Sequence, residues 1–183
     1  TASAGSFSEL MKGLANLEKL GFKRVGGNTT VVKGNMRALP ALAGLYVGLG
    51  TRNVEYIFVD PNYGGARNDF ARQVPRISEA APYMKKALSI GLAAGLGHWK
   101  ARYVPLCHFQ GFEKQISEIN ERLLFRTEHW APDFKNTDAI GSRSLVGRRR
   151  TAACKGCARF HLCEGIWVEY LKRYGDRELK AIK

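Results

Sequence analysis

The chain lacks the features that would place it in or across a membrane. None of the apolar runs in its 183 residues reaches the roughly 20 residues that a bilayer-spanning helix needs. The first residues are small and polar, whereas a secretory signal has a basic start and an apolar core. We therefore expect a cytoplasmic protein without a membrane partner.

Acidic residues are also scarce. The chain has 16 of them against 29 lysines and arginines, which gives a formal net charge of +13. An excess of positive charge favours an anionic partner. We expect an anionic small molecule or a peptide substrate, with nucleic acid as the alternative. Hydrophobic residues make up 45% of the chain, which is typical of a globular protein and not of a disordered one.

Cysteine is absent from the first 106 residues, and three of the four cysteines then fall within ten positions. Cys154, Cys157 and Cys163 form a C-x2-C-x5-C motif, and Cys107 ends an apolar, strand-like run upstream. Thiolates are soft ligands, and four of them suit a zinc ion or an iron–sulfur cluster. Gly156 lets the backbone turn tightly within the motif. We predict that these four cysteines bind one metal centre, in preference to being buried free thiols or forming disulfides.

Helical and strand-like segments alternate as far as Cys107. Apolar residues at helical spacing predict helices that begin near Ser6, Pro40 and Ser78 and end at Gly21, Gly50 and Gly95. Runs of β-branched and apolar residues predict strands over Thr29–Lys33, Val54–Val59 and Trp99–Leu106. The composition of residues 60–75 predicts a loop. The order αβαβαβ indicates a parallel α/β sheet or part of a barrel.

The pattern changes after Cys107, so we divide the chain into residues 1–107 and residues 108–183. A helix is expected from Glu113 to Leu124, and another, short one around Tyr170. Residues 126–150 show no clean period and end in three consecutive arginines, 148–150. We expect these arginines to be a solvated loop, with an anion clamp as the functional alternative.

Four stretches of the chain form a larger pattern. They are Gly5-Ser6-Phe7, Asn28 to Pro40, Phe58-Val59-Asp60-Pro61 with Pro75 to Tyr83, and Pro105-Leu106-Cys107 with Gly111-Phe112-Glu113 and C-x2-C-x5-C-E-G. Together they resemble the C-terminal half of a radical S-adenosylmethionine (SAM) enzyme. The resemblance is to the branch whose barrel is followed by an auxiliary iron–sulfur segment of the SPASM or twitch type.

This resemblance implies a fold and a set of cofactors. The fold would be the C-terminal half of a partial TIM-like (β/α)6 barrel, followed by a cysteine-rich extension that holds an auxiliary 4Fe–4S cluster on the four cysteines. Asn28, Lys33 and Asn35 would bind SAM or an anionic substrate group in the complete protein. The plainer alternatives are a solvated lysine and asparagines that hold turns.

Family members also carry a C-x3-C-x2-C motif, which holds the cluster that cleaves SAM, and this chain has none. It also lacks the first three β/α units and begins at Thr1. We therefore expect a fragment whose partner is the missing N-terminal half, inactive as this chain alone and with no catalytic residue that we can name. In such a half-barrel the edge of the first strand and an apolar inner face would be exposed. The alternative function is a zinc-stabilised, basic nucleic-acid-binding module.

Overall fold

The computed structural model describes residues 3–22, 24–124, 129–131, 134–138 and 141–183. The α-helices are α1 (Ser6–Lys19), α2 (Leu39–Gly48), α3 (Gly64–Asn68), α4 (Phe70–Gln73), α5 (Ile77–Ala93), α6 (Ser117–Leu124) and α8 (Val168–Tyr174). The strands are β1 (Gly26–Val31), β2 (Asn53–Phe58), β3 (Lys100–Arg102), β4 (His129–Ala131), β5 (Phe134–Asn136), β6 (Arg148–Arg149) and β7 (Ile166–Trp167). Short helical turns are η1 (Met36–Ala38), η2 (Leu106–His108), η3 (Glu113–Gln115), η4 (Ser142–Gly147) and η5 (Ala152–Cys154).

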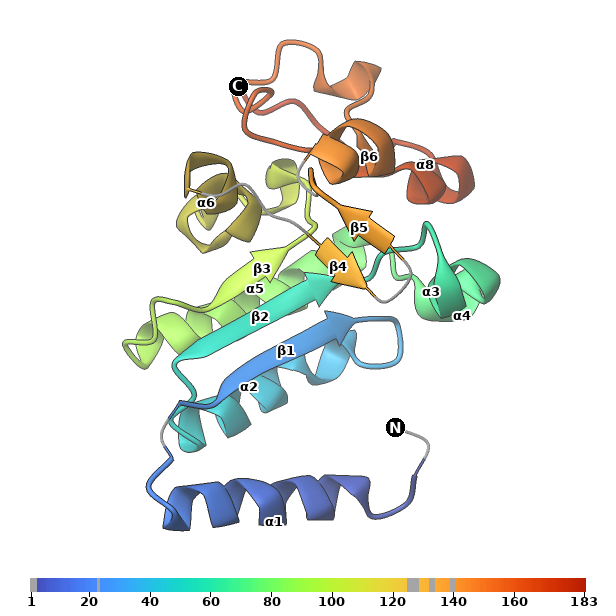
Figure 1. Cartoon of the computed structure of the whole chain (residues 1–183). Coiled ribbons are helices and arrows are strands. Elements are labelled where there is room, and N and C mark those ends of the chain that lie inside the picture. Colours follow the sequence, from blue (N-terminus) through green and yellow to red (C-terminus); the bar gives the residue numbers. More distant parts are fainter. Residues whose placement is uncertain (1–2, 23, 125–128, 132–133, 139–140) are drawn as a thin grey trace.

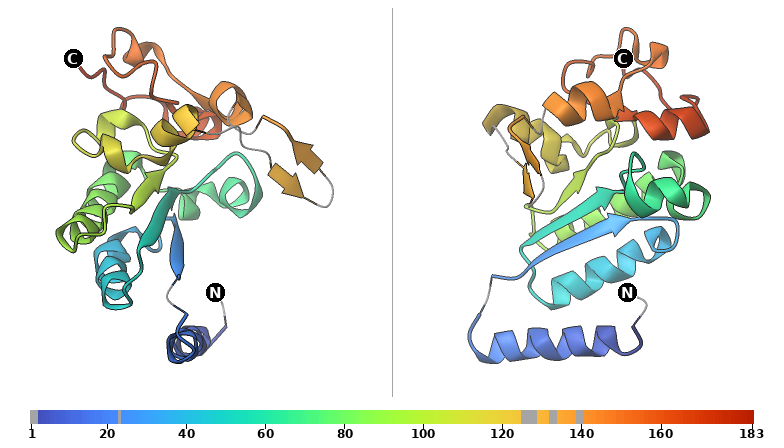
Figure 2. Two further views of the ribbon diagram at one scale, coloured as in Figure 1. Left: turned by 60° about the vertical axis from the view of Figure 1, so that its left-hand side comes forward. Right: turned by 45° about the vertical axis from the view of Figure 1, so that its right-hand side comes forward.

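A three-stranded parallel sheet in the order β1-β2-β3 forms the centre of the structure (Figure 1). β1 pairs with β2 along its whole length, from Gly26 opposite Asn53 to Val31 opposite Phe58. α2 and α5 connect the strands and lie side by side on one face of the sheet (Figures 1 and 2). The predicted α/β class with a parallel sheet is confirmed.

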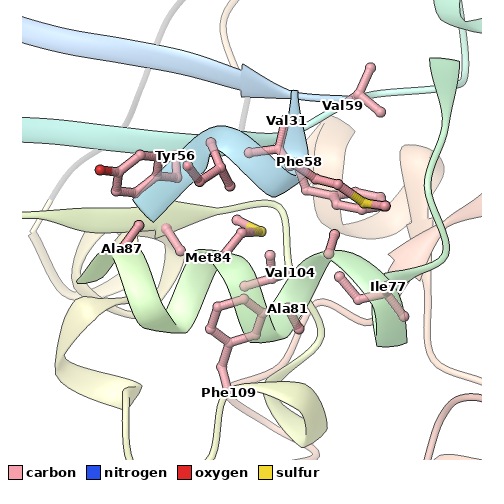
Figure 3. Close-up of a cluster of buried hydrophobic side chains, with 14 of the residues drawn as sticks. Val31, Tyr56, Phe58, Val59, Ile77, Ala81, Met84, Ala87, Val104 and Phe109 are labelled. Atoms are coloured by element: carbon pink, nitrogen blue, oxygen red, sulfur yellow. The ribbon is translucent and has the colours of Figure 1, made fainter. Parts of the chain in front are cut away.

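The face of the sheet that α2 and α5 cover holds the core. Side chains alternate between the two faces of a strand, and β2 directs Tyr56 and Phe58 towards the helices, where both are fully buried. They pack with Val31 from β1 and with Ala81 and Met84 from α5 (Figure 3). Burial of this apolar surface stabilises the helix–sheet layers by roughly 25 cal/mol per Å².

The opposite face of the sheet is mainly polar. The alternate positions of β1, β2 and β3 carry Asn28, Thr30, Glu55 and Arg102, with Ile57 as the apolar member, and all of them are exposed or half-buried. Our expectation of an apolar inner face is therefore wrong, because the strands alternate instead of being apolar on both sides. The expected open edge is present, since β1 is the outer strand and pairs only with β2 among the described residues.

The strand bounds differ from those that we predicted. β3 ends at Arg102, four residues earlier than expected, because Tyr103 adopts a left-handed backbone with φ 64° that cannot continue a strand. Cys107 therefore lies in the helical turn η2 and not at the end of a strand. Residues 60–75, which were predicted to be a loop, contain the short helices α3 and α4.

Helix α1 lies beyond β1, at the open edge of the sheet, in each view of the chain (Figures 1 and 2). It begins at the predicted Ser6 and has the expected apolar stripe, but none of its side chains is buried. Phe7 and Leu10 are 62% and 58% exposed. The helix that carries these exposed apolar side chains thus lies next to the unpaired edge of β1 (Figure 1).

Residues 166–174 pack over the carboxyl ends of the strands. The Tyr170 hydroxyl accepts a hydrogen bond from the Ile77 backbone N–H at 2.9 Å, and the Tyr174 hydroxyl donates to the Val74 carbonyl at 2.9 Å. Trp167 and Tyr170 belong to the same buried cluster as the β/α layers, so residues on both sides of the boundary at 107 share one core. In the part of the chain that the structure describes, no helix is long and apolar enough to cross a bilayer.

We predict that the chain self-associates through the β1 edge and the apolar stripe of α1, because unpaired strand edges and exposed apolar stripes promote association. The variant Leu10→Lys should weaken self-association about tenfold, which corresponds to the loss of roughly 1.4 kcal/mol of apolar contact. Light scattering over a range of concentrations measures this. Leu145→Lys is the control, since Leu145 is 74% exposed but lies far along the chain in η4. Equal effects of the two variants would contradict an interface on α1.

Candidate metal centre

The four cysteines are free thiols that lie half-buried in two regions of the chain. Cys107 is in η2, while Cys154 ends η5 and begins the loop that carries Cys157 and Cys163 to β7. Burial raises the pKa of the Cys107 thiol, and the neighbouring thiols of Cys163 and Cys154 add to this rise. Three of the four cysteines therefore lie close enough to interact electrostatically.

Two glycines allow the loop to follow this path. The Cys157 backbone N–H donates to the Cys154 carbonyl at 3.1 Å, which closes a turn whose central Gly156 has φ 72°. The tight turn that we predicted from Gly156 is present. Gly165, two residues after Cys163, has φ 79°, and a Cβ atom there would lie 2.0 Å from the Arg149 carbonyl oxygen. Glycine at 165 thus lets the end of the loop pass against β6.

Backbone amides donate to three of the four sulfur atoms. The N–H groups of Leu106 and Gly165 donate to Cys163 Sγ at 3.4 and 3.3 Å. The N–H group of Ile182 donates to Cys157 Sγ at 3.3 Å. The N–H group of Lys180 donates to the Cys107 thiol and opposes the rise of its pKa. Such donors stabilise negative charge on sulfur, which is the charge state that a metal-bound thiolate carries.

The amides of residues 180 and 182 belong to a segment that our sequence reasoning did not connect with the cysteines. A backbone donor leaves no side-chain signal in the sequence, so the pattern of residues could not have revealed it.

The side chains are not already arranged as a metal site. Among the residues that the structure describes, no group of three or more His, Cys, Asp or Glu side chains could hold a metal ion as they stand. The donor type and the amides around the sulfurs suit a soft metal, but the four thiols would have to close together to bind it. His108, a neighbour of Cys107, has its Nε2 atom 2.8 Å from the Glu178 carbonyl oxygen. A single centre on the four cysteines thus stays a prediction.

The three residues predicted to bind a cofactor lie in different surroundings. The Asn35 side chain forms hydrogen bonds within the turn after β1. Its Oδ1 accepts a hydrogen bond from the Val32 N–H at 2.9 Å, and its Nδ2 donates one to the Thr30 carbonyl at 2.8 Å. The Lys33 ammonium donates to the Ala71 carbonyl at 2.6 Å, near the carboxyl end of the sheet.

Asn28 lies at the other end of the sheet. It lines a cavity of about 530 Å³ with Asn53, Glu55 and Lys100, at the amino ends of β2 and β3. The structure does not bring Asn28 and Lys33 into one site, and the cofactor-binding role of Asn28, Lys33 and Asn35 remains a prediction.

Asp60 is a polar group at the carboxyl end of β2 to which we assigned no role. Burial raises the pKa of its carboxyl group, although hydrogen bonds from the Asn62 N–H, at 2.8 Å, and from the Tyr63 side chain oppose the rise. An acidic residue directly after a buried strand is the signal that could have marked it, because sites in β/α folds lie at the carboxyl ends of strands.

A buried ion-pair network connects the cysteine loop to α6. Arg148 is 1% exposed, and its Nη1 lies 2.7 Å from Glu118 and 3.1 Å from Glu164. Arg143 binds the Glu164 carboxylate through two nitrogens, each at 2.8 Å. Burial, together with the charge of Glu164, raises the pKa of Glu118, and Arg148 opposes that rise. Because Glu164 follows Cys163 directly, the network fixes one end of the cysteine loop.

Our expectation that the arginines 148–150 form a solvated loop is therefore wrong. Arg148 is in the network, and Arg150 donates to the Phe160 carbonyl at 2.7 Å with its guanidinium over the Phe160 ring. Arg149 is exposed. Arg148 and Arg149 form β6, which pairs with β7, and successive side chains of a strand point to opposite sides. The two adjacent arginines therefore have different surroundings.

Comparison of the chain with protein-family models, with curated proteins and with solved structures finds no match.

The variant Arg148→Met should lower the free energy of unfolding by about 3–5 kcal/mol, because it leaves buried carboxylates without their partner. Arg149→Met is the matched control and should change it by less than about 0.5 kcal/mol, as is usual for exposed positions. Denaturant unfolding followed by circular dichroism measures both. Similar losses in the two variants would show that burial of Arg148 is unimportant for stability.

Proposed function

We propose that this chain is the distal part of a radical SAM enzyme and that Cys107, Cys154, Cys157 and Cys163 hold an auxiliary 4Fe–4S cluster. The observation that carries the proposal is the set of backbone N–H groups directed at the sulfurs of Cys107, Cys157 and Cys163. Neutral buried thiols have little need of such donors. Cluster-bound thiolates are stabilised by them, and hydrogen bonds to sulfur help to set cluster potentials.

The β/α layers support the barrel part of the proposal. Parallel strands with helices on one face are what one side of an open (β/α) barrel would have, and this chain has both. The unpaired edge of β1 and the uncovered stripe of α1 are where the preceding β/α units of the complete protein would pack.

When bound, a cluster at these cysteines supplies one-electron chemistry. The protein contributes the thiolates, the amides that stabilise their charge, and partial shielding from water. Lys33 lies near the carboxyl end of β1, where in the complete protein it would neutralise the carboxylate of SAM or an anionic group of the substrate.

The first test is the identity of the metal. Protein that is purified and reconstituted without oxygen should be brown and contain about four iron and four sulfide ions per chain. Each Cys→Ser variant at positions 107, 154, 157 and 163 should lower the iron content. His161→Gln is the control, because His161 lies in the same loop outside the proposed ligand set, and it should retain the cluster.

A colourless protein with one zinc ion per chain would contradict the iron–sulfur proposal. That result would favour the zinc-stabilised nucleic-acid-binding module, for which the net charge of +13 is the supporting observation.

The second test concerns activity. The reconstituted chain should not release 5′-deoxyadenosine from SAM under reducing conditions, because it has no C-x3-C-x2-C motif to hold a SAM-cleaving cluster. Chromatography of the reaction mixture measures the product against a reaction without protein and against an intact radical SAM enzyme. Product above the protein-free level would show that this chain cleaves SAM by itself, and it would overturn the proposal that the chain holds only an auxiliary cluster.

A further inference from the structure

The C-terminal segment of the chain is attached to the start of α5 by the side chain of Glu178. One carboxylate oxygen of Glu178 accepts hydrogen bonds from the Ser78 backbone N–H, at 3.2 Å, and from the Ser78 hydroxyl. The other accepts from the Tyr170 hydroxyl and from Arg76 at 3.3 Å. Ser78 lies in α5, Arg76 directly before it and Tyr170 in α8, so the single carboxylate fixes where the segment begins.

From Glu178 onwards the segment passes along the cysteines. The Glu178 carbonyl oxygen lies 2.8 Å from His108 Nε2, and Leu179 is buried in the core. Ile182 then bonds to the cysteine loop in both directions: its N–H donates to Cys157 Sγ at 3.3 Å, and its carbonyl accepts from the Ala158 N–H at 2.8 Å. The segment contacts both regions of the chain that carry cysteines.

We propose that residues 178–182 form a backbone clamp that strengthens metal binding at the cysteines, and that Glu178 is the positioning residue that holds this clamp in place. The inference rests on the proposed function only in requiring a metal at these thiolates. Its chemistry is a hydrogen bond to sulfur, which withdraws negative charge from the thiolate and stabilises its bound form. The donor from Lys180 to Cys107 supports the same role.

Two variants at position 182 separate the N–H group from the side chain. Ile182→Pro removes the donor to Cys157, and Ile182→Ala removes the side chain but keeps the donor. With Co²⁺ as the probe, the dissociation constant of Ile182→Pro should exceed that of Ile182→Ala about fivefold, the factor for one net hydrogen bond. The thiolate-to-cobalt charge-transfer band should also move to lower energy, because a thiolate without its donor is more electron-rich.

The role of Glu178 is tested with a charge-matched pair of variants. Glu178→Gln should weaken Co²⁺ binding, because it loosens the attachment to Ser78, Tyr170 and Arg76. Glu169→Gln should leave Co²⁺ binding unchanged, since the Glu169 carboxylate pairs with Lys172 and Arg173 on its own helix. Thermal melts of all the variants separate loss of the fold from loss of the clamp.

The possible outcomes distinguish the two proposals. Equal Co²⁺ affinity and equal charge-transfer energy in Ile182→Pro and Ile182→Ala would overturn the clamp and leave the metal centre standing. The absence of any charge-transfer band in the unaltered protein would overturn the clamp, while the iron and sulfide content after reconstitution decides the metal centre separately. The two Ile182 variants could differ in Co²⁺ affinity while Glu178→Gln and Glu169→Gln bind Co²⁺ equally well. That result would overturn only the positioning role of Glu178.

Discussion

The second half of the structure depends on one buried guanidinium. Arg148 bonds to Glu118 in α6, to Glu164 beside Cys163, and to the carbonyl of Gly165. An unpaired charge in this position would cost several kcal/mol of desolvation, so the arginine and the carboxylates are tolerated only together. The pairing ties the end of the cysteine loop to the helix that follows the sheet, and it is satisfied only when the loop, α6 and the sheet are in their native places.

The backbone of Tyr103 is a second constraint, and it acts next to the Arg148 network. Its left-handed backbone ends β3, and its N–H donates to Glu118, which also binds Arg148. The ring of Tyr103 packs edge-on against Trp167 with ring centres 4.9 Å apart. A non-glycine residue in this conformation costs of order 1–3 kcal/mol unless its surroundings hold it. Here the ion-pair network and the ring contact hold it, and η2 with Cys107 is thereby turned towards the cysteine loop.

The amides around the sulfurs connect these constraints to the proposed chemistry. Donors come from Leu106 on one side, from Gly165 at the end of the loop and from Ile182 in the C-terminal segment. Each donor is held by a different interaction: the backbone path after Tyr103, the Arg148 network and the Glu178 carboxylate. The candidate metal centre is therefore a product of long-range contacts, although all of its proposed ligands are visible in the chain as cysteines.

The β/α order, the parallel sheet, most helix starts and the tight turn at Gly156 could be predicted from the amino-acid sequence alone. Those features follow from apolar periodicity and from backbone preferences that act over a few residues. The burial of Arg148 next to an exposed Arg149, the end of β3 at Tyr103 and the position of Ile182 beside Cys157 depend instead on tertiary contacts. The partners in these cases are 8 to 102 residues apart, from Tyr170 and Glu178 to Arg76 and Glu178. No local pattern records which distant groups will meet, because that depends on how the layers pack.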